Sequence, residues 1–168
     1  MRRKQSSTCF FCMGIQRVCV VYSLRRERAS SKSTFYSVTV EGYFPMSAQT
    51  IQFFFTMREQ LKVYHWQTGM FSRHKGTDDV LHKLDELIDM FVEIYMGKRG
   101  KPSLTRTTNT VSLRNMSEKS AVKFVKDCIQ YLQTTVPKSL KPQDTDLINI
   151  RDEMMGELNK LLYLFTLR

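Results

Sequence analysis

Apolar residues recur at three- and four-residue intervals through most of the chain after residue 46, and this spacing limits the fold more than any other feature. Side chains three and four positions apart share one face of an α-helix, so each such run predicts a helix with a buried stripe. The runs cover residues 47–66 and 71–97, a third begins at Ser117, and a fourth begins at Asp144 or Thr145. The chain is therefore predicted to be all-α.

The links between these helices differ in length. Residues 98–116 are polar and have no helical period, whereas the other two links are short. Gly69 and Gly97 are expected to end the first and second helices. One long crossover between helices two and three is the ferritin-like connectivity of a four-helix bundle. We expect residues 46–168 to form that single bundle domain.

Residues 1–45 lack the period and carry most of the excess charge. They hold eight Lys or Arg and two acidic residues, net +6 of the total +10. Their longest apolar run, 9–24, is interrupted by polar residues and is shorter than the roughly 20 residues that span a bilayer. We expect a basic extension that is disordered, or untranslated if Met46 is the true start. If present, it could bind DNA phosphates non-specifically. No membrane partner is predicted, and the expected location is cytoplasmic.

The second predicted helix carries a polar stripe beside its apolar face. Six acidic or histidine side chains fall within about 100° of its circumference, at about 100° per residue: His74, Asp78, His82, Asp85, Asp89 and Glu93. No lysine joins the stripe as an i,i+4 partner, and Asp85, Asp89 and Glu93 follow one another at single-turn intervals. Like charges at that spacing repel unless a cation or protons lie between them. Carboxylate and imidazole ligands together suit iron, manganese or zinc.

A metal site on this stripe needs further ligands. All three histidines lie between positions 65 and 82, and the Glu-x-x-His spacing that di-iron bundles use on two helices is absent. The remaining ligands could be Glu153 and Glu157 of the last helix, or a second copy of the stripe related by a two-fold axis. The third possibility is a solvated acidic face without metal.

A His-Trp pair closes the first predicted helix, and a spaced His, Asp, Asp and Glu follow on the second: His65, Trp66, His74, Asp78, Asp89 and Glu93. This pattern resembles the mini-ferritins of the Dps type (DNA-binding proteins from starved cells), over residues 50–97 and 144–166. The resemblance implies a ferroxidase site for non-haem iron, or for Mn or Zn, between two chains. One chain would supply His65, His74 and Asp78, and its partner Asp89 and Glu93. It also implies a homodimer or a larger, cage-like homo-oligomer.

Residues 57–68 and 84–89 are also similar to an uncharacterised family of large algal DNA viruses. This similarity leaves open a non-catalytic helical structural or interaction protein, in the host cytoplasm or the virion, that has lost the metal. His82 and Asp85 are off the Dps-type pattern, so we expect them at the surface or beside the ligands. Trp66 is predicted to pack in the core rather than to relay electrons. No catalytic residue separate from the metal ligands is predicted.

Overall fold

The computed structural model describes residues 46–102, 104 and 110–167. They form four α-helices and one short 3-10 helix: α1 (Ala48–Gln67), α2 (Phe71–Arg99), α3 (Glu118–Thr134), η1 (Val136–Ser139) and α4 (Thr145–Leu164). No strand occurs among these residues, which confirms the predicted all-α class. No helix in the described ranges is long and apolar enough to cross a membrane. The predicted extension, 1–45, and its DNA contacts lie outside the described residues.

Local chemistry sets the helix ends. Ser47 precedes α1, and its hydroxyl oxygen accepts a hydrogen bond from the backbone N–H of Thr50 at 3.2 Å, as an N-cap does. The prediction that Gly97 ends α2 is wrong by two residues, because the helix continues to Arg99. Gly100 ends it instead, with φ at 75°, a conformation that glycine adopts without a Cβ clash.

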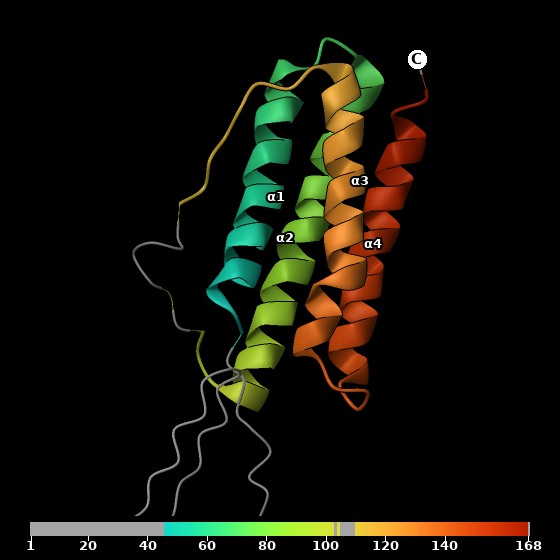
Figure 1. Ribbon diagram of the computed structural model, residues 1–168. Coiled ribbons are helices and arrows are strands. Elements are labelled where there is room, and N and C mark those ends of the chain that lie inside the picture. The colour runs from blue at the N-terminus through green and yellow to red at the C-terminus, as the bar shows by residue number, and fades with distance from the viewer. Residues whose placement is uncertain (1–45, 103, 105–109, 168) are drawn as a thin grey trace, which may run out of the picture. The chain divides into compact units, whose positions relative to one another are not determined.

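The four α-helices lie side by side, two running in one direction and two in the opposite direction. In Figure 1, α1 and α4 run one way along the molecule, and α2 and α3 run the other way. Since α2 and α3 are parallel, the segment between them must return along the length of the helices. The observed connectivity therefore has the long crossover at the predicted place.

Glutamine side chains of α1 hold the second half of this crossover. The amide of Gln60, almost fully buried, donates to the carbonyl of Arg114 at 2.7 Å and accepts from its N–H at 3.0 Å. Gln67 accepts from the N–H of Met116 at 3.2 Å, and Gln52 donates to a carbonyl of the same segment at 2.6 Å. These bonds satisfy backbone groups that have no helix or sheet partner, so they attach the crossover to α1.

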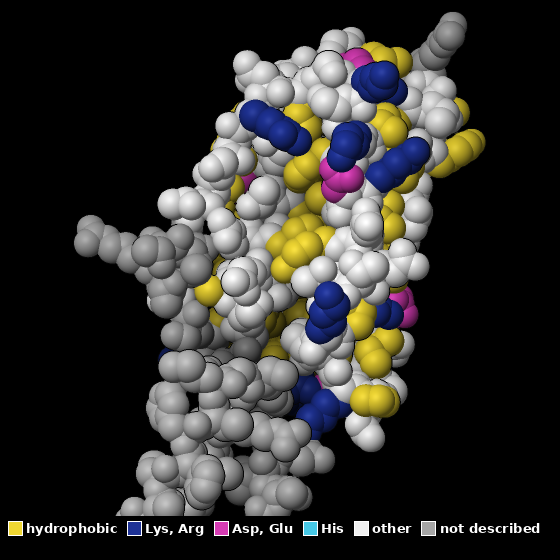
Figure 2. Space-filling model, in the orientation of Figure 1, with side chains coloured by type: hydrophobic (Ala, Val, Ile, Leu, Met, Phe, Trp, Pro, Cys, Tyr) yellow, Lys and Arg dark blue, Asp and Glu magenta, His cyan; other side chains and the backbone are white. Residues whose placement is uncertain are grey.

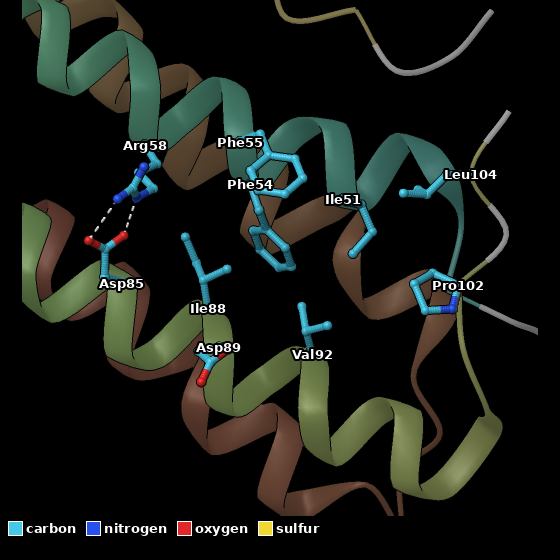
Figure 3. Close-up of a pocket in the computed structure, with 10 residues that line it drawn as sticks. All are labelled: Ile51, Phe54, Phe55, Arg58, Asp85, Ile88, Asp89, Val92, Pro102 and Leu104. Carbon is cyan, nitrogen blue, oxygen red and sulfur yellow. Dashed lines mark hydrogen bonds and ion pairs between the residues drawn. The ribbon is translucent and has the colours of Figure 1, made fainter. Parts of the chain in front are cut away.

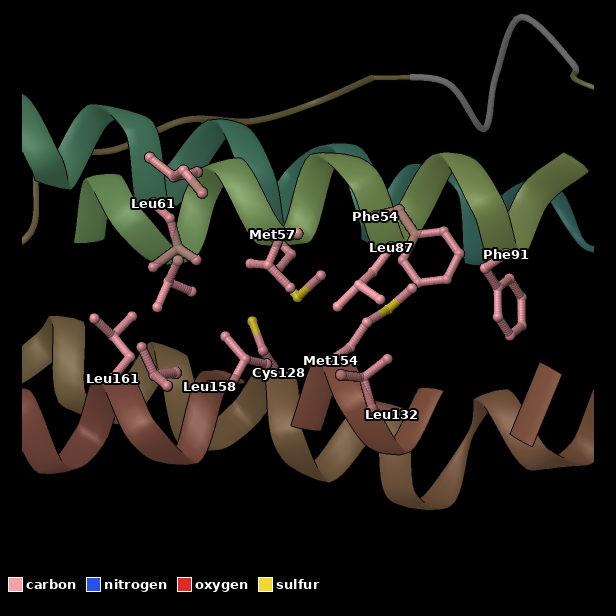
Figure 4. Packing of buried hydrophobic residues seen from close by; sticks show 14 of the residues in the cluster. Phe54, Met57, Leu61, Leu87, Phe91, Cys128, Leu132, Met154, Leu158 and Leu161 are labelled. Atoms are coloured by element: carbon pink, nitrogen blue, oxygen red, sulfur yellow. The ribbon is translucent and has the colours of Figure 1, made fainter. Parts of the chain in front are cut away.

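The core lies between the α1–α2 pair and the α3–α4 pair (Figure 4). Its side chains are large, apolar and almost fully buried: Phe54, Met57, Leu61, Leu84, Phe91, Cys128, Leu132, Met154, Leu158 and Leu161. Burial raises the pKa of the Cys128 thiol to about 12, so this cysteine is an inert packing residue. Gly76 allows α4 to approach α2 closely, because a Cβ there would lie 3.0 Å from a methyl group of Leu164.

A polar cluster around Arg73 joins all four helices at one end of the bundle. The Arg73 guanidinium lies 2.9 Å from a carboxylate oxygen of Glu118 and donates to the carbonyl of Phe165 at 2.9 Å. The hydroxyl groups of Tyr64 and Thr68 also donate to Glu118. Burial acts to raise the pKa of Glu118, but the hydrogen bonds from Tyr64 and Thr68 and the charge of Arg73 lower it below its ordinary value.

A second polar cluster lies where α2 ends and α4 begins. Arg99 and Lys98 both pair with the buried carboxylate of Asp144, and Asp144 also accepts from the N–H of Lys141 at 2.7 Å. The fourth helix was predicted to begin at Asp144 or Thr145, and it begins at Thr145 with Asp144 in the N-cap position, but the Asp144 side chain binds these groups and makes no capping hydrogen bond. The cluster therefore fixes the α3–α4 turn against the end of α2.

Candidate metal centre

The six residues of the predicted stripe, called here the α2 stripe, all lie on α2: His74, Asp78, His82, Asp85, Asp89 and Glu93. Asp78 and Asp85 are half-buried, and the other four are exposed. None of the chain's three histidines is visible on the face shown in Figure 2, where Lys and Arg side chains are spread over α3 and its neighbours. The adjoining side of α2 carries the core residues, so one helix has two chemically distinct sides.

His65 and His74 form a closed pair across the α1–α2 turn. Their rings stack, with centroids 3.9 Å apart and planes 25° from parallel. The Nδ1 atom of His65 lies 3.0 Å from the carbonyl oxygen of His74, and the Nδ1 atom of His74 lies 2.8 Å from the carbonyl oxygen of His65. A carbonyl oxygen can only accept, so both Nδ1 atoms carry the proton. In a neutral ring this leaves the Nε2 lone pair available, which is the arrangement of histidines that bind metals.

Asp78 lies beside this pair. One of its carboxylate oxygens is 3.8 Å from Nε2 of His65 and 3.6 Å from Nζ of Lys62. Partial burial acts to raise the pKa of Asp78, but the charges of His65 and Lys62 lower it below its ordinary value. The structure therefore brings three of the five predicted ligands, His65, His74 and Asp78, to one end of α2.

Asp85, in the middle of the stripe, pairs with Arg58 of α1. The Arg58 guanidinium binds both carboxylate oxygens, one of them at 3.2 Å, and the bonds to Asp85 raise the pKa of Arg58 (Figure 3). The repulsion expected along the stripe is therefore relieved at Asp78 and Asp85, although no lysine of α2 joins the stripe as an i,i+4 partner. The cations come from the neighbouring helix, and a search along α2 alone could not find them. The spacing of Arg58, Lys62 and His65 on α1 was the available signal.

Asp89 and Glu93 differ from the first two carboxylates. Both are exposed, and within the described part of the chain neither forms an ion pair. They lie about four and about five helical turns from His74, so one helix cannot bring them to the His65–His74 pair. Across the described residues, no group of three or more His, Cys, Asp or Glu side chains is arranged to hold a metal ion. The structure thus separates the five predicted ligands into a set of three and a set of two.

A hollow opens between α1 and α2 next to the second set. Its volume is about 340 Å³, and its lining is mostly apolar: Ile51, Phe54, Phe55, Ile88, Val92, Pro102 and Leu104, with Arg58, Asp85 and Asp89 at one end (Figure 3). Phe55 is half-exposed there. Sequence reasoning missed this groove, because it forms only where the edges of two helices and the start of the crossover meet.

The prediction that Trp66 packs in the core is wrong. Its side chain is 68% exposed, and Nζ of Lys62 lies 5.9 Å from the ring centroid. Trp66 follows the buried His65 on α1, and successive helical residues point about 100° apart, so burial of one turns the other to solvent. Trp66 is thus a surface neighbour of the histidine pair.

A model of a protein family, described as a family of unknown function (DUF5856), matches residues 65–165. The chain belongs to this family. Neither the curated proteins nor the solved structures contain a match to the chain.

The segment matched by the DUF5856 family begins at His65 and ends at Phe165, so it contains all five predicted ligands. It also contains both residues of the Arg73–Glu118 pair. Most of α1, including Arg58 and Lys62, lies before the matched segment. The family region therefore includes the α2 stripe in full, while two of the cations that pair with it lie outside.

Proposed function

We propose that this chain is a ferritin-like, Dps-type metal-binding protein whose site lies between two copies of α2. One copy supplies His65, His74 and Asp78, and the other supplies Asp89 and Glu93. Imidazole nitrogen and carboxylate oxygen together suit iron, with manganese and zinc as alternatives. Fe(II) would be the substrate, with peroxide or dioxygen as the electron acceptor.

The observation that carries this proposal is the histidine pair. Each ring donates its Nδ1–H to a backbone carbonyl of the other histidine, which fixes the tautomer and the ring orientation before any ligand arrives. Asp78, one turn after His74, adds a carboxylate beside Nε2 of His65. Two imidazoles and one carboxylate leave coordination positions for further oxygen ligands.

The positions on α2 support a two-fold arrangement. The midpoint between His74 and Glu93 in the sequence is also the midpoint between Asp78 and Asp89, and it falls between Lys83 and Leu84. If two α2 helices cross in antiparallel directions at that point, each His74 faces Glu93 of the other copy and each Asp78 faces Asp89. A two-fold axis then forms two identical sites from one sequence.

The fold is compatible with this proposal. Four helices with a long crossover between the parallel pair α2 and α3 have the connectivity of ferritin-like bundles. In such bundles metal ligands project from helices that face one another. Here the α2 stripe faces away from its own bundle, and a second copy that covers it would place the stripe between two facing helices.

The test is Zn(II) and Fe(II) binding to the full chain, with Fe(II) titrated without oxygen. His74→Ala and Glu93→Ala should each abolish high-affinity binding, because each removes one half of both sites. His82→Ala is the matched control, since His82 shares the stripe but lies outside the proposed ligand set, and it should bind like the parent. Sites should reappear when the two defective variants are mixed, at about a quarter of the parental number, because half of randomly mixed dimers keep one intact site.

Two results would reject the intersubunit site. The first is a mixture that exchanges subunits yet binds no more metal than either variant. The second is full binding by Glu93→Ala, which would assign the metal to a single chain.

A second candidate is a non-catalytic helical interaction protein, and the observation that favours it is the position of Lys62. Its ammonium group lies 3.6 Å from Asp78, where it competes with a metal for the same carboxylate. The two candidates predict different rates of Fe(II) oxidation. A ferroxidase given Fe(II) and peroxide develops ferric absorbance faster than buffer, whereas a non-catalytic protein matches the buffer blank.

A further inference from the structure

We propose that Phe71 of one copy docks into the α1–α2 groove of a second copy, and that this contact sets how the two chains pair. The inference rests on the proposed function in one respect, the antiparallel pairing of two α2 helices. It adds a contact that involves none of the predicted metal ligands. The partner is a second copy of this chain, and the contact is apolar.

The projecting group is at the first turn of α2. Phe71 is 82% exposed, more than any other large hydrophobic side chain in the described ranges. At about 100° per residue it falls on the same side of α2 as Asp78 and Asp89, so it belongs to the face that carries the α2 stripe. A single exposed apolar side chain is common on protein surfaces, so Phe71 supports an interface only together with the groove on the same face.

The receiving groove is near the other end of the same face. Its apolar lining comes from α1, from α2 and from the start of the crossover, and Figure 3 shows Pro102 and Leu104 beyond Val92. A cavity of about 150 Å³ is enough to bind benzene. The groove, at about 340 Å³, therefore has room for a phenyl ring beside the half-exposed ring of Phe55.

The pairing that joins the proposed metal ligands also joins the ring to the groove. When antiparallel α2 helices cross between Lys83 and Leu84, Phe71 of one copy lies at the level of Met96 of the other. Met96 is half-buried, faces the stripe side and follows Val92 by one turn. The same axis thus serves two independent sets of residues. A projection and a groove at opposite ends of one face are self-complementary under a two-fold rotation.

The charges along this face favour the same direction. At the Phe71 end the carboxylate of Asp78 is offset by the ammonium group of Lys62, whereas Asp89 and Glu93 at the groove end have no ion pair among the described residues. An antiparallel arrangement places the charge-balanced end of one copy on the acidic end of the other. A parallel arrangement would place Asp89 and Glu93 of both copies together, which is unfavourable.

The experiment measures the mass of the full chain in solution by sedimentation equilibrium, without metal. The parent should be a dimer or a multiple of one. Phe71→Asp should raise the dimer dissociation constant by roughly a thousandfold. The two-fold axis repeats the contact, so the substitution removes two anchors, and each anchor contributes at least about thirtyfold. The new carboxylate lies at a helix N-terminus, where negative charge is tolerated, so the fold should survive.

Two further variants test the specificity of the effect. Tyr163→Asp changes another exposed aromatic residue, 64% exposed on α4, and should leave the mass unchanged. Phe71→Leu keeps an apolar group at the docking position and should remain dimeric. A parental monomer at tens of micromolar overturns the inference, as does a Phe71→Asp protein that dimerises like the parent.

The two proposals fail separately. If Phe71→Asp stays dimeric and the parent binds Zn(II), the docking contact is wrong and the metal site stands. If dimerisation depends on Phe71 and the parent binds neither Zn(II) nor Fe(II), the docking contact stands and the metal site is wrong.

Discussion

The two sides of α2 differ in how far their side chains are buried within the chain. On the inner side, Leu84 and Phe91 are almost fully buried in the core of their own chain. On the outer side, Asp89 and Glu93 are exposed, and Asp89 lines one end of an apolar groove. The inner side obtains its packing partners from the same chain. The outer side has carboxylates and apolar surface that are exposed to solvent. Substitutions on the inner side should therefore change folding, and those on the outer side should change binding.

The largest expected difference comes from one residue on each side. Phe91→Ala removes a ring that packs edge-on against Phe54, with centroids 5.5 Å apart. It should lower the free energy of unfolding by about 3–5 kcal/mol, through lost burial and a residual cavity. Glu93→Ala should change it by less than about 0.5 kcal/mol without metal. Urea denaturation measures both, and equal effects would contradict the comparison.

Removing an ion pair should also cost more unfolding free energy on the inner side of α2 than on the outer side. The Arg73 side chain is mostly buried, and Arg73→Met leaves Glu118 without its cation, so we expect a loss of about 2–3 kcal/mol. Arg58→Met is the matched control, because Arg58 pairs with Asp85 on the stripe side and its side chain is more exposed than that of Arg73. Its loss should stay below about 1 kcal/mol. A larger effect for Arg58 would place a structural ion pair on the outer side.

The pH dependence of stability gives a smaller test of the Arg73 cluster. The pKa of Glu118 is lowered in the folded state, so its contribution is complete above the unfolded value of about 4.3 and is lost as the pH falls through the folded value. Glu118→Gln should cost about 1 kcal/mol at pH 7, since the carboxylate is partly exposed. The difference in melting temperature between parent and variant should shrink from pH 6 to pH 3. A constant difference would show that charge is not the cause.

The smallest expected effect is at Trp66. With 68% of its side chain in solvent, Trp66→Ala should change the free energy of unfolding by less than about 0.5 kcal/mol. Because it is the only tryptophan, its fluorescence in the parent should have the red-shifted emission of an exposed indole. A blue-shifted emission would show that another molecule or copy covers it.

The candidate site was predictable in part. The spacing of His74, Asp78, Asp89 and Glu93 along one face follows from helix geometry, so the α2 stripe could be derived from the sequence. The contact between His65 and His74 could not, because it depends on the turn that folds α1 back onto α2. The pairing of Asp85 with Arg58 joins residues 27 positions apart, and no periodicity within one helix reports it.

The sequence by itself determined the all-α class, the four helical segments and the long crossover, because three- and four-residue spacing and cap residues such as Ser47 act over single turns. Only the tertiary structure decided which stripe carboxylates are paired, that Trp66 faces solvent, and that a groove opens beside Val92. Those features depend on how the edges of α1 and α2 meet. The packing of the whole core sets that relative placement, because every core contact needs side chains from two helices at once.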